Sequence, residues 1–133
     1  MGFLAPHTEK IYALFRIMTG LLFAQHGFQK VLGWFGGIPA GMMPDALRYS
    51  AGSIELLGGV LVAIGLLTGP AAFISSGTMM VAFFLGHVSR DPNHSLIPLV
   101  NNGDLAVIFC WAFFLIAAKG AGIWSVDAAR GEK

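Results

Sequence analysis

Residues 50–88 read SAGSIELLGGVLVAIGLLTGPAAFISSGTMMVAFFLGHV, and Glu55 is the only Asp, Glu, Lys or Arg among them. Thr68-Gly69-Pro70 divides this stretch into two apolar runs, 50–67 and 70–88. Glycine commonly ends a helix and proline often opens one, so we predict a tight turn at residues 68–70. Each run is close to the roughly 20 residues that a helix needs to cross a bilayer. The stretch therefore predicts two membrane-spanning helices.

Two further apolar runs flank this stretch, at about residues 11–32 and 104–119. All four runs are continuously apolar rather than alternating, which favours helices over the strands of a membrane barrel. We therefore predict an all-α fold, a transmembrane four-helix bundle formed by a single domain over residues 1–133. An even number of spans places both termini on the same side of the membrane. The sequence also permits the second helix to begin before residue 50, because Pro44-Asp45 is a plausible helix start.

The composition agrees with a multi-pass membrane protein in contact with lipid. Of the 133 residues, 56% are hydrophobic and 11% are charged, whereas a soluble domain carries about 25% charged residues. The net charge of +1 and the lack of a basic cluster argue against a nucleic-acid partner. Cys110 is the only cysteine, so neither an internal disulfide nor a CxxC pair is possible. Glu9 and Lys10 precede the first run, which we expect to remain in the mature protein.

The basic residues divide unequally between the two predicted sides of the membrane. Those expected on the side of the termini are Lys10, Lys119, Arg130 and Lys133, with Arg16 near it inside the first run. Those expected on the other side are Lys30, Arg48 and Arg90. Because basic residues are more frequent in cytoplasmic loops, this difference favours cytoplasmic termini.

Each predicted span carries an acidic residue or a histidine near the same membrane face. These residues are His26, Glu55, His87 and Asp104. Ionisable groups at membrane depth are costly and usually mark a functional site, so we predict that these four side chains converge as a catalytic cluster. At 100° per residue, Gln29 and Lys30 share the face of His26, and Arg16 lies at its margin. The Glu55 face carries Gly52, Gly58 and Gly59, which permit another helix to approach closely.

Each residue also has a structural alternative. Asp104 can complement the dipole at a helix N-terminus, and His87 can do the same at a C-terminus. Lys30 can extend to lipid headgroups, and Arg16 can bind a carbonyl or a lipid phosphate. A buried bridge from Glu55 to Lys30 or Arg16 would fix the helix packing without taking part in any reaction.

Five motifs occur in an order that resembles the DoxX family of small four-helix membrane proteins. The motifs are Arg16-x3-Gly20-x2-Phe23-x2-His26-Gly27-x2-Lys30-x2-Gly33; Ala51-Gly52-x2-Glu55-Leu56-x-Gly58-Gly59 with Gly65-Leu66-Leu67-Thr68; His87; Asn102-Gly103-Asp104-Leu105-Ala106; and Gly120-x-Gly122-x-Trp124-Ser125-x-Asp127. Together they cover about residues 11–128. Two positions depart from the family pattern: Asp104 stands where glutamate is more usual, and Gly69 replaces a frequent basic residue.

The resemblance implies a four-helix bundle in the bacterial or archaeal cytoplasmic (plasma) membrane. Membrane subunits of thiosulfate:quinone oxidoreductase are similar to this family, and most members have no assigned reaction. The first hypothesis is therefore a quinone-interacting subunit of an oxidoreductase system, with a redox partner protein or a second copy of the chain. The histidines and Glu55 would deliver protons, and Lys30 or Arg16, with Gln29, would bind the quinone head. The residues expected to line an apolar slot are Phe23, Met80, Phe83 and Phe84.

Three other functions remain open from the residues alone. A non-catalytic adaptor would use the glycine-rich helix faces to assemble a partner complex. A metal or haem protein would use the two histidines and two carboxylates, but no ExxH or HxxxH spacing is present, so we assign no metal ligand. A transporter is less favoured, because no inverted repeat is evident.

Overall fold

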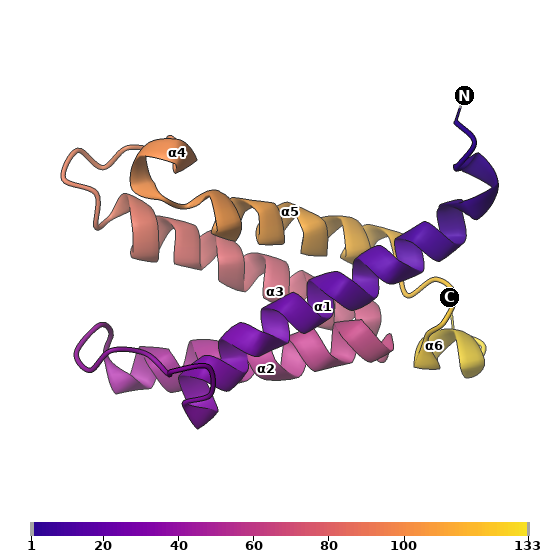
Figure 1. The fold of residues 1–133 in the computed structure, drawn as a ribbon, viewed down its shortest axis with the longest axis horizontal. Coiled ribbons are helices and arrows are strands. Elements are labelled where there is room, and N and C mark those ends of the chain that lie inside the picture. Colours follow the sequence, from indigo (N-terminus) through magenta and orange to yellow (C-terminus); the bar gives the residue numbers. More distant parts are fainter. Residues whose placement is uncertain (1, 133) are drawn as a thin grey trace.

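The computed structural model describes residues 2–132. The regular elements among these residues are all helices, and there is no strand (Figure 1). The long helices are α1 (Thr8–Leu32), α2 (Asp45–Ile64), α3 (Thr68–Ala82) and α5 (Asp104–Lys119). A π-helical segment, η2 (Phe83–Val88), continues α3 without a break. The short elements are η1 (Ala5–His7), α4 (Pro98–Asn101) and α6 (Val126–Ala129). The all-helical prediction is confirmed for the described residues.

The helices begin and end close to the predicted limits, with one difference. The second helix starts at Asp45, directly after Pro44, which confirms the earlier start that Pro44-Asp45 indicated. The turn between α2 and α3 lies at residues 65–67 rather than 68–70. Gly65 ends α2 with a φ of 72°, and Leu67 has a φ of 49°. Thr68-Gly69-Pro70 instead forms the first turn of α3, where proline removes no helical hydrogen bond.

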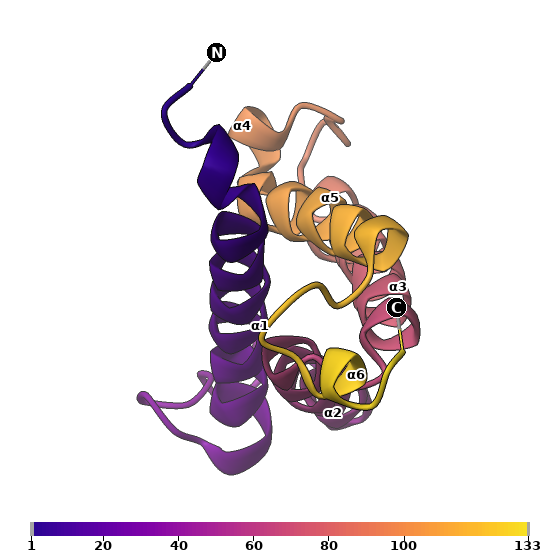
Figure 2. The ribbon, with the colours of Figure 1, turned by 90° about the vertical axis from the view of Figure 1, so that its right-hand side faces the viewer.

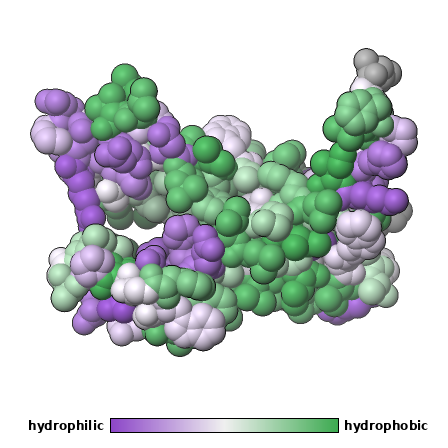
Figure 3. All heavy atoms as spheres, viewed as in Figure 1, coloured by the Kyte–Doolittle hydropathy of each residue, from purple (hydrophilic) through white to green (hydrophobic). Residues whose placement is uncertain are grey.

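Two helical stretches, Asp45–Ile64 and Thr68–Val88, are long and apolar enough to cross a membrane. Large hydrophobic side chains cover the outside of the helices, and Leu57, Phe73, Ile108 and Trp111 each expose more than 60% of their surface. Figure 3 shows this as an apolar middle, with hydrophilic residues gathered mainly toward the two ends of the molecule. Such a surface suits contact with lipid better than contact with water.

The long helices form two pairs that lie close together at one end. Helix α1 packs mainly on α2, and α3 packs mainly on α5. The pairs meet near the α2–α3 turn and separate toward the opposite end (Figure 1). Seen from the closed end, the segment after α5 crosses between the helices and leads to α6 (Figure 2).

Glycines bring α1 and α2 into backbone contact. A Cβ atom added to Gly20 would lie 2.5 Å from the carbonyl oxygen of Gly59, and one added to Gly59 would lie 2.5 Å from the backbone nitrogen of Ala24. Gly27 is packed in the same way against the backbone of Leu56. The predicted close approach of another helix to α2 is therefore confirmed, with α1 as the partner at Gly52 and Gly59 and α3 as the partner at Gly58.

Arg16 fixes the closed end from the side of α1. Its side chain is completely buried, and its Nη1 donates to the carbonyl oxygens of Val62 and Ala63 at 2.9 and 3.0 Å. Its Nη2 donates to the carbonyls of Ile123 and Trp124 at 3.3 and 2.7 Å. The last carbonyl groups of a helix lack hydrogen-bond donors within it and carry partial negative charge. The buried guanidinium supplies the missing donors and a compensating positive charge.

Asp127 fixes the same end from α6. Its carboxylate accepts hydrogen bonds from the backbone N–H groups of Leu67 and Thr68 at 3.0 and 2.9 Å, and from the Thr68 hydroxyl at 2.8 Å. Its own N–H donates to the carbonyl of Gly65 at 2.8 Å. Arg16 thus binds the end of α2 while Asp127 binds the start of α3. We call Arg16, Asp127 and these backbone partners the terminal clasp.

Replacing Gly59 with alanine should destabilise the α1–α2 contact. The added methyl group would meet backbone atoms that cannot move without separating the helices, so we expect a loss of about 1–3 kcal/mol in unfolding free energy. The measurement is reversible unfolding of the detergent-purified protein. Gly77→Ala is the control, because nothing lies within 4 Å of its added Cβ and alanine favours a helix interior. Equal stability of the two variants would contradict the proposed packing.

The terminal clasp should lose stability in acid. Burial alone would raise the pKa of Asp127, but the hydrogen bonds from Thr68 and Leu67 outweigh it and hold the pKa below its ordinary value of 3.8. Asp127 therefore stabilises the fold above about pH 4, and this contribution disappears as the pH falls through the lower folded pKa.

Asp127→Asn should lower the unfolding free energy by about 1–2 kcal/mol at pH 7, and the difference from the unsubstituted protein should narrow below pH 4. Melting curves between pH 3 and 7 provide the measurement. Asp104→Asn is a matched control, since Asp104, like Asp127, lies in the first turn of a helix but makes no capping hydrogen bond there. A difference between Asp127→Asn and the unsubstituted protein that does not change with pH would refute the assignment.

Candidate functional site

A cavity of about 730 Å³ lies between the two helix pairs, at the end where they separate. Figure 3 shows the hollow at this end of the molecule. Most of its wall is apolar and comes from all four long helices, with Phe23 on α1, Ile54 on α2, Met79 on α3 and Phe109 on α5. The ionisable side chains on its wall are His26, Lys30, Glu55, His87 and Arg90. The cavity therefore combines an apolar interior with a small set of polar groups, as ligand sites commonly do.

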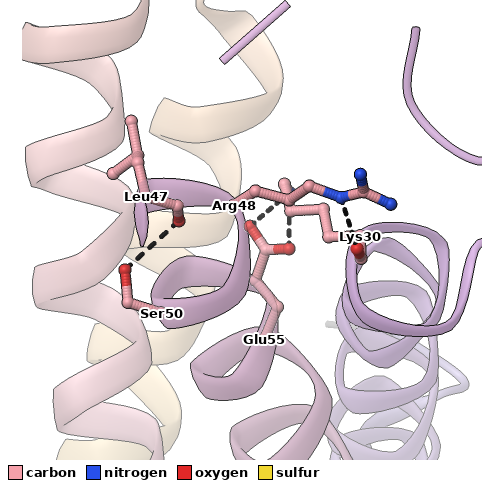
Figure 4. A network of polar contacts seen from close by, with 5 residues as sticks. All are labelled: Lys30, Leu47, Arg48, Ser50 and Glu55. Atoms are coloured by element: carbon pink, nitrogen blue, oxygen red, sulfur yellow. Dashed lines mark hydrogen bonds and ion pairs between the residues drawn. The ribbon is translucent and has the colours of Figure 1, made fainter. Parts of the chain in front are cut away.

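Lys30 and Glu55 form an ion pair on the cavity wall (Figure 4). The Lys30 Nζ lies 2.7 and 2.5 Å from the two carboxylate oxygens, and Glu55 is 4% exposed. Arg48 Nε donates to the backbone carbonyl of Lys30 at 2.7 Å. A Cβ atom on Gly52 would lie 2.7 Å from the Lys30 Cβ, so this glycine leaves room for the lysine against α2. The Lys30–Glu55 bridge considered in the sequence analysis is thus present, and Lys30 is turned toward Glu55.

The two histidines reach the cavity from different helices. His26 of α1 is half-buried, and its ring stands edge-on to Phe109, with centroids 6.1 Å apart and an interplanar angle of 88°. His87 belongs to the π-helical segment η2, and its Nδ1 lies 3.2 Å from the backbone carbonyl oxygen of Asn101. Single turns of π-helix are frequent at functional sites because the extra residue shifts the side chains that follow.

Asp104 lies outside this group. It is the first residue of α5, its side chain is exposed, and it makes no capping hydrogen bond. Asn102 and Leu105 line the cavity, but Asp104 does not. His26, Glu55 and His87 therefore line one cavity, and Asp104 does not. Being apolar on every side, the α5 sequence does not indicate which face turns inward.

Arg16 also lies away from the cavity, because its guanidinium belongs to the terminal clasp at the opposite end of α1. Of the sequence alternatives for Arg16, the carbonyl-binding one is observed. Gln29 is absent from the cavity wall as well. Among the residues predicted to bind a cofactor, Phe23 and Lys30 are the ones that line the cavity.

Three of the residues predicted to line an apolar slot lie outside the cavity wall. Met80 of α3 and Phe83 and Phe84 of η2 do not line the cavity, whereas Phe23 of α1 does. The face that carries Ser76 and Phe83 packs on α5 and its approach: the Ser76 hydroxyl donates to the carbonyl of Cys110 at 2.8 Å, and Phe83 packs against Gly103. The adjacent face turns to the cavity instead. Its residues are Gly77, Thr78, Val81, Ala82, Leu85 and Gly86.

Arg90 also lines the cavity, although its sequence position marked it only as a basic residue of a loop. It follows η2, is exposed, and makes no hydrogen bond or ion pair with any residue between 2 and 132. Its position two residues before Pro92 gave no sign that the chain turns back toward the cavity. Within the same range, no three His, Cys, Asp or Glu side chains are grouped so that they could hold a metal ion.

Comparison with known proteins agrees with this architecture. The family model described as DoxX matches residues 11–88, which comprise α1, α2, α3 and η2. The chain belongs to the DoxX family. It is therefore a membrane protein, as the apolar outer surface indicates. No solved structure matches it.

Two curated relatives extend the similarity beyond residue 88. An uncharacterized protein of Haemophilus influenzae is 34% identical over 131 residues, which cover 96% of each chain. A Bacillus subtilis protein named "Putative oxidoreductase CatD" is 41% identical over 120 residues, covering 86% of this chain and 82% of the relative. The helices that form the cavity therefore all lie within the chain length shared with the first relative.

The Lys30–Glu55 pair should show strong coupling in a double-mutant cycle. Lys30→Met or Glu55→Met alone leaves a buried charge without its partner, so each should cost about 3 kcal/mol of unfolding free energy. The double variant Lys30→Met/Glu55→Met should recover most of this loss. The exposed pair Lys119–Glu9 is the control, with an expected coupling below about 1 kcal/mol. Additive losses at Lys30 and Glu55 would contradict a direct buried pair.

Proposed function

We propose that the chain is a transmembrane four-helix bundle in the plasma membrane, in which α1, α2, α3 with η2, and α5 each cross the bilayer. The described ends of the chain, near residues 2 and 132, lie toward the same end of the long helices, which supports termini on one side of the membrane (Figure 1). The distribution of basic residues favours the cytoplasm for that side. The cavity would then open toward the extracytoplasmic face.

We further propose that this protein is the membrane subunit of a redox system and binds a quinone in the cavity. The observation that carries this proposal is the combination of an apolar wall with His26, His87 and the Lys30–Glu55 pair. An apolar ring and tail fit such a wall, and the polar groups fit the two oxygens of the ring. The name of the Bacillus subtilis relative supports a redox context.

The residues of the cavity suit the proton chemistry of a quinone. Converting a quinone to a hydroquinone consumes two electrons and two protons. The imidazole rings of His26 and His87 can donate and accept protons, and Glu55 can exchange a proton when its pairing with Lys30 is relaxed. The Lys30 ammonium can donate a hydrogen bond to a ring oxygen. The electrons would come from a redox partner protein docked on the membrane domain.

A cavity-filling substitution tests this proposal. Gly86 lines the cavity and has nothing within 4 Å of an added Cβ, so Gly86→Leu should occupy the quinone site without disturbing the helices. We expect it to weaken binding of a short-chain benzoquinone by at least about tenfold, which corresponds to roughly 1.4 kcal/mol. The measurement is titration of purified protein in lipid nanodiscs, alongside quinone analysis of the organic extract.

Gly69→Leu provides the matched control for this experiment. Gly69 also has open space around an added Cβ, but it lies at the start of α3 and does not line the cavity. Quinone binding should be unchanged in this variant. If neither the unsubstituted protein nor Gly69→Leu binds the quinone or its hydroquinone, or if Gly86→Leu binds them equally well, the proposed function is wrong.

A further inference from the structure

The two ring nitrogens of His87 have different surroundings. Nδ1 lies 3.2 Å from the backbone carbonyl oxygen of Asn101. A carbonyl oxygen can only accept, so this hydrogen bond requires the proton to be on Nδ1. In the neutral imidazole, Nε2 then carries a lone pair and acts as an acceptor. Nε2 makes no hydrogen bond with any residue of the described chain, although the side chain lines the cavity.

The acceptor for Nδ1 is held in place by a second set of hydrogen bonds. Asn101 is buried, its Nδ2 donates to the carbonyl of Ser95 at 2.9 Å, and its Oδ1 accepts from the N–H of Gly103 at 2.8 Å. A Cβ on Gly103 would lie 2.7 Å from the Phe83 ring, so this loop packs tightly on η2. The tautomer of His87 is therefore set by the fold before any ligand enters, as is common for functional histidines.

The other polar groups of the cavity offer a contrast. Both carboxylate oxygens of Glu55 already accept from Lys30, and Lys30 and Arg90 can only donate. His87 is thus a wall group with a fixed tautomer and an unused acceptor. An acceptor selects between the two oxidation states of a quinone, because quinone oxygens only accept hydrogen bonds whereas hydroquinone hydroxyls also donate.

We propose that His87 Nε2 accepts a hydrogen bond from a ligand hydroxyl, so that the cavity binds the hydroquinone in preference to the quinone. This inference rests on the proposed function and adds which oxidation state of the ligand the cavity prefers. A quinone in the same position would bring an oxygen lone pair against the lone pair of Nε2. His87 is then the residue that determines which form of the ligand is held.

The experiment compares both oxidation states on one protein. Purified protein in nanodiscs is titrated with a short-chain benzoquinone, with its hydroquinone under anaerobic reducing conditions, and with the dimethyl ether of that hydroquinone. One net hydrogen bond is worth a factor of roughly 3–10 in affinity, so the hydroquinone should bind tighter than the quinone by that factor. The dimethyl ether has no hydroxyl hydrogen and should lose this advantage.

Substitutions at His87 separate a ligand role from a structural one. His87→Asn retains a donor for the Asn101 carbonyl but has no group at the Nε2 position, so the preference for the hydroquinone should disappear while the melting temperature changes little. His94→Asn is the matched control. The Nδ1 of His94 has a similar contact, 3.3 Å from the Val88 carbonyl, but His94 is exposed and does not line the cavity. The preference should persist in this variant.

The outcomes distinguish the two proposals. Binding of neither oxidation state would overturn the proposed function and this inference together. Equal binding of both states would overturn only the inference, and so would a preference that survives in His87→Asn. Tight binding of the dimethyl ether would also overturn it, and that result needs no substituted protein.

Discussion

The backbone contact between α1 and α2 is the constraint on which the rest of the structure depends. Gly20, Gly27 and Gly59 leave no space for a side chain where the two helices meet. Helices in lipid gain little from burying apolar side chains against each other, so close backbone packing is a main source of their association. The same contact brings Lys30 of α1 within 2.7 Å of Glu55 of α2. The charged pair is thus a consequence of glycine packing, since helices held apart by larger residues would place the ammonium beyond the reach of the carboxylate.

The terminal clasp and the cavity lie at opposite ends of the same two helix pairs. At one end, Arg16 and Asp127 join the termini of α2 and α3 to the C-terminal segment and hold the helix pairs together. At the other end, no hydrogen bond among the described residues joins the loop after α1 to the loop after η2, and the pairs separate (Figure 1). Two cations on one helix therefore serve different purposes. The hydrogen bonds that Arg16 donates through Nη1 and Nη2 all go to backbone carbonyls, whereas the partner of Lys30 lies on the wall of a cavity that a ligand can enter.

The sequence predicted the helices well because continuous apolar runs, glycines and prolines act locally. It also placed His26, Glu55 and His87 at one end, because helix direction and depth follow from counting residues. It failed where neighbouring helices decide the result. The face of α3 that carries Ser76 and Phe83 packs on α5 and its approach, which turns the adjacent face to the cavity. The role of Asp127 in the terminal clasp depends on contacts with Leu67 and Thr68, about sixty positions away in the sequence. No local sequence pattern predicts these contacts. Arg16 and Asp127 both belong to the five family motifs, but the resemblance does not indicate that they bind the same end of the helix pairs.

The charge balance of the cavity indicates what kind of head group it suits. Lys30 and Glu55 neutralise each other, and both are largely buried. His87 has a neutral form in which Nδ1 donates to a carbonyl, and Arg90 is exposed to the surroundings of the cavity. Among the charged groups of the cavity wall, Arg90 is the one without a partner within residues 2–132, and it is exposed. An anionic head group placed beside the Lys30–Glu55 pair would therefore lose its hydration without gaining a free counter-charge there, which is costly in an apolar setting. A neutral ring with oxygens on opposite sides carries no such cost at that position, which supports the proposed quinone or hydroquinone over an anionic amphiphile.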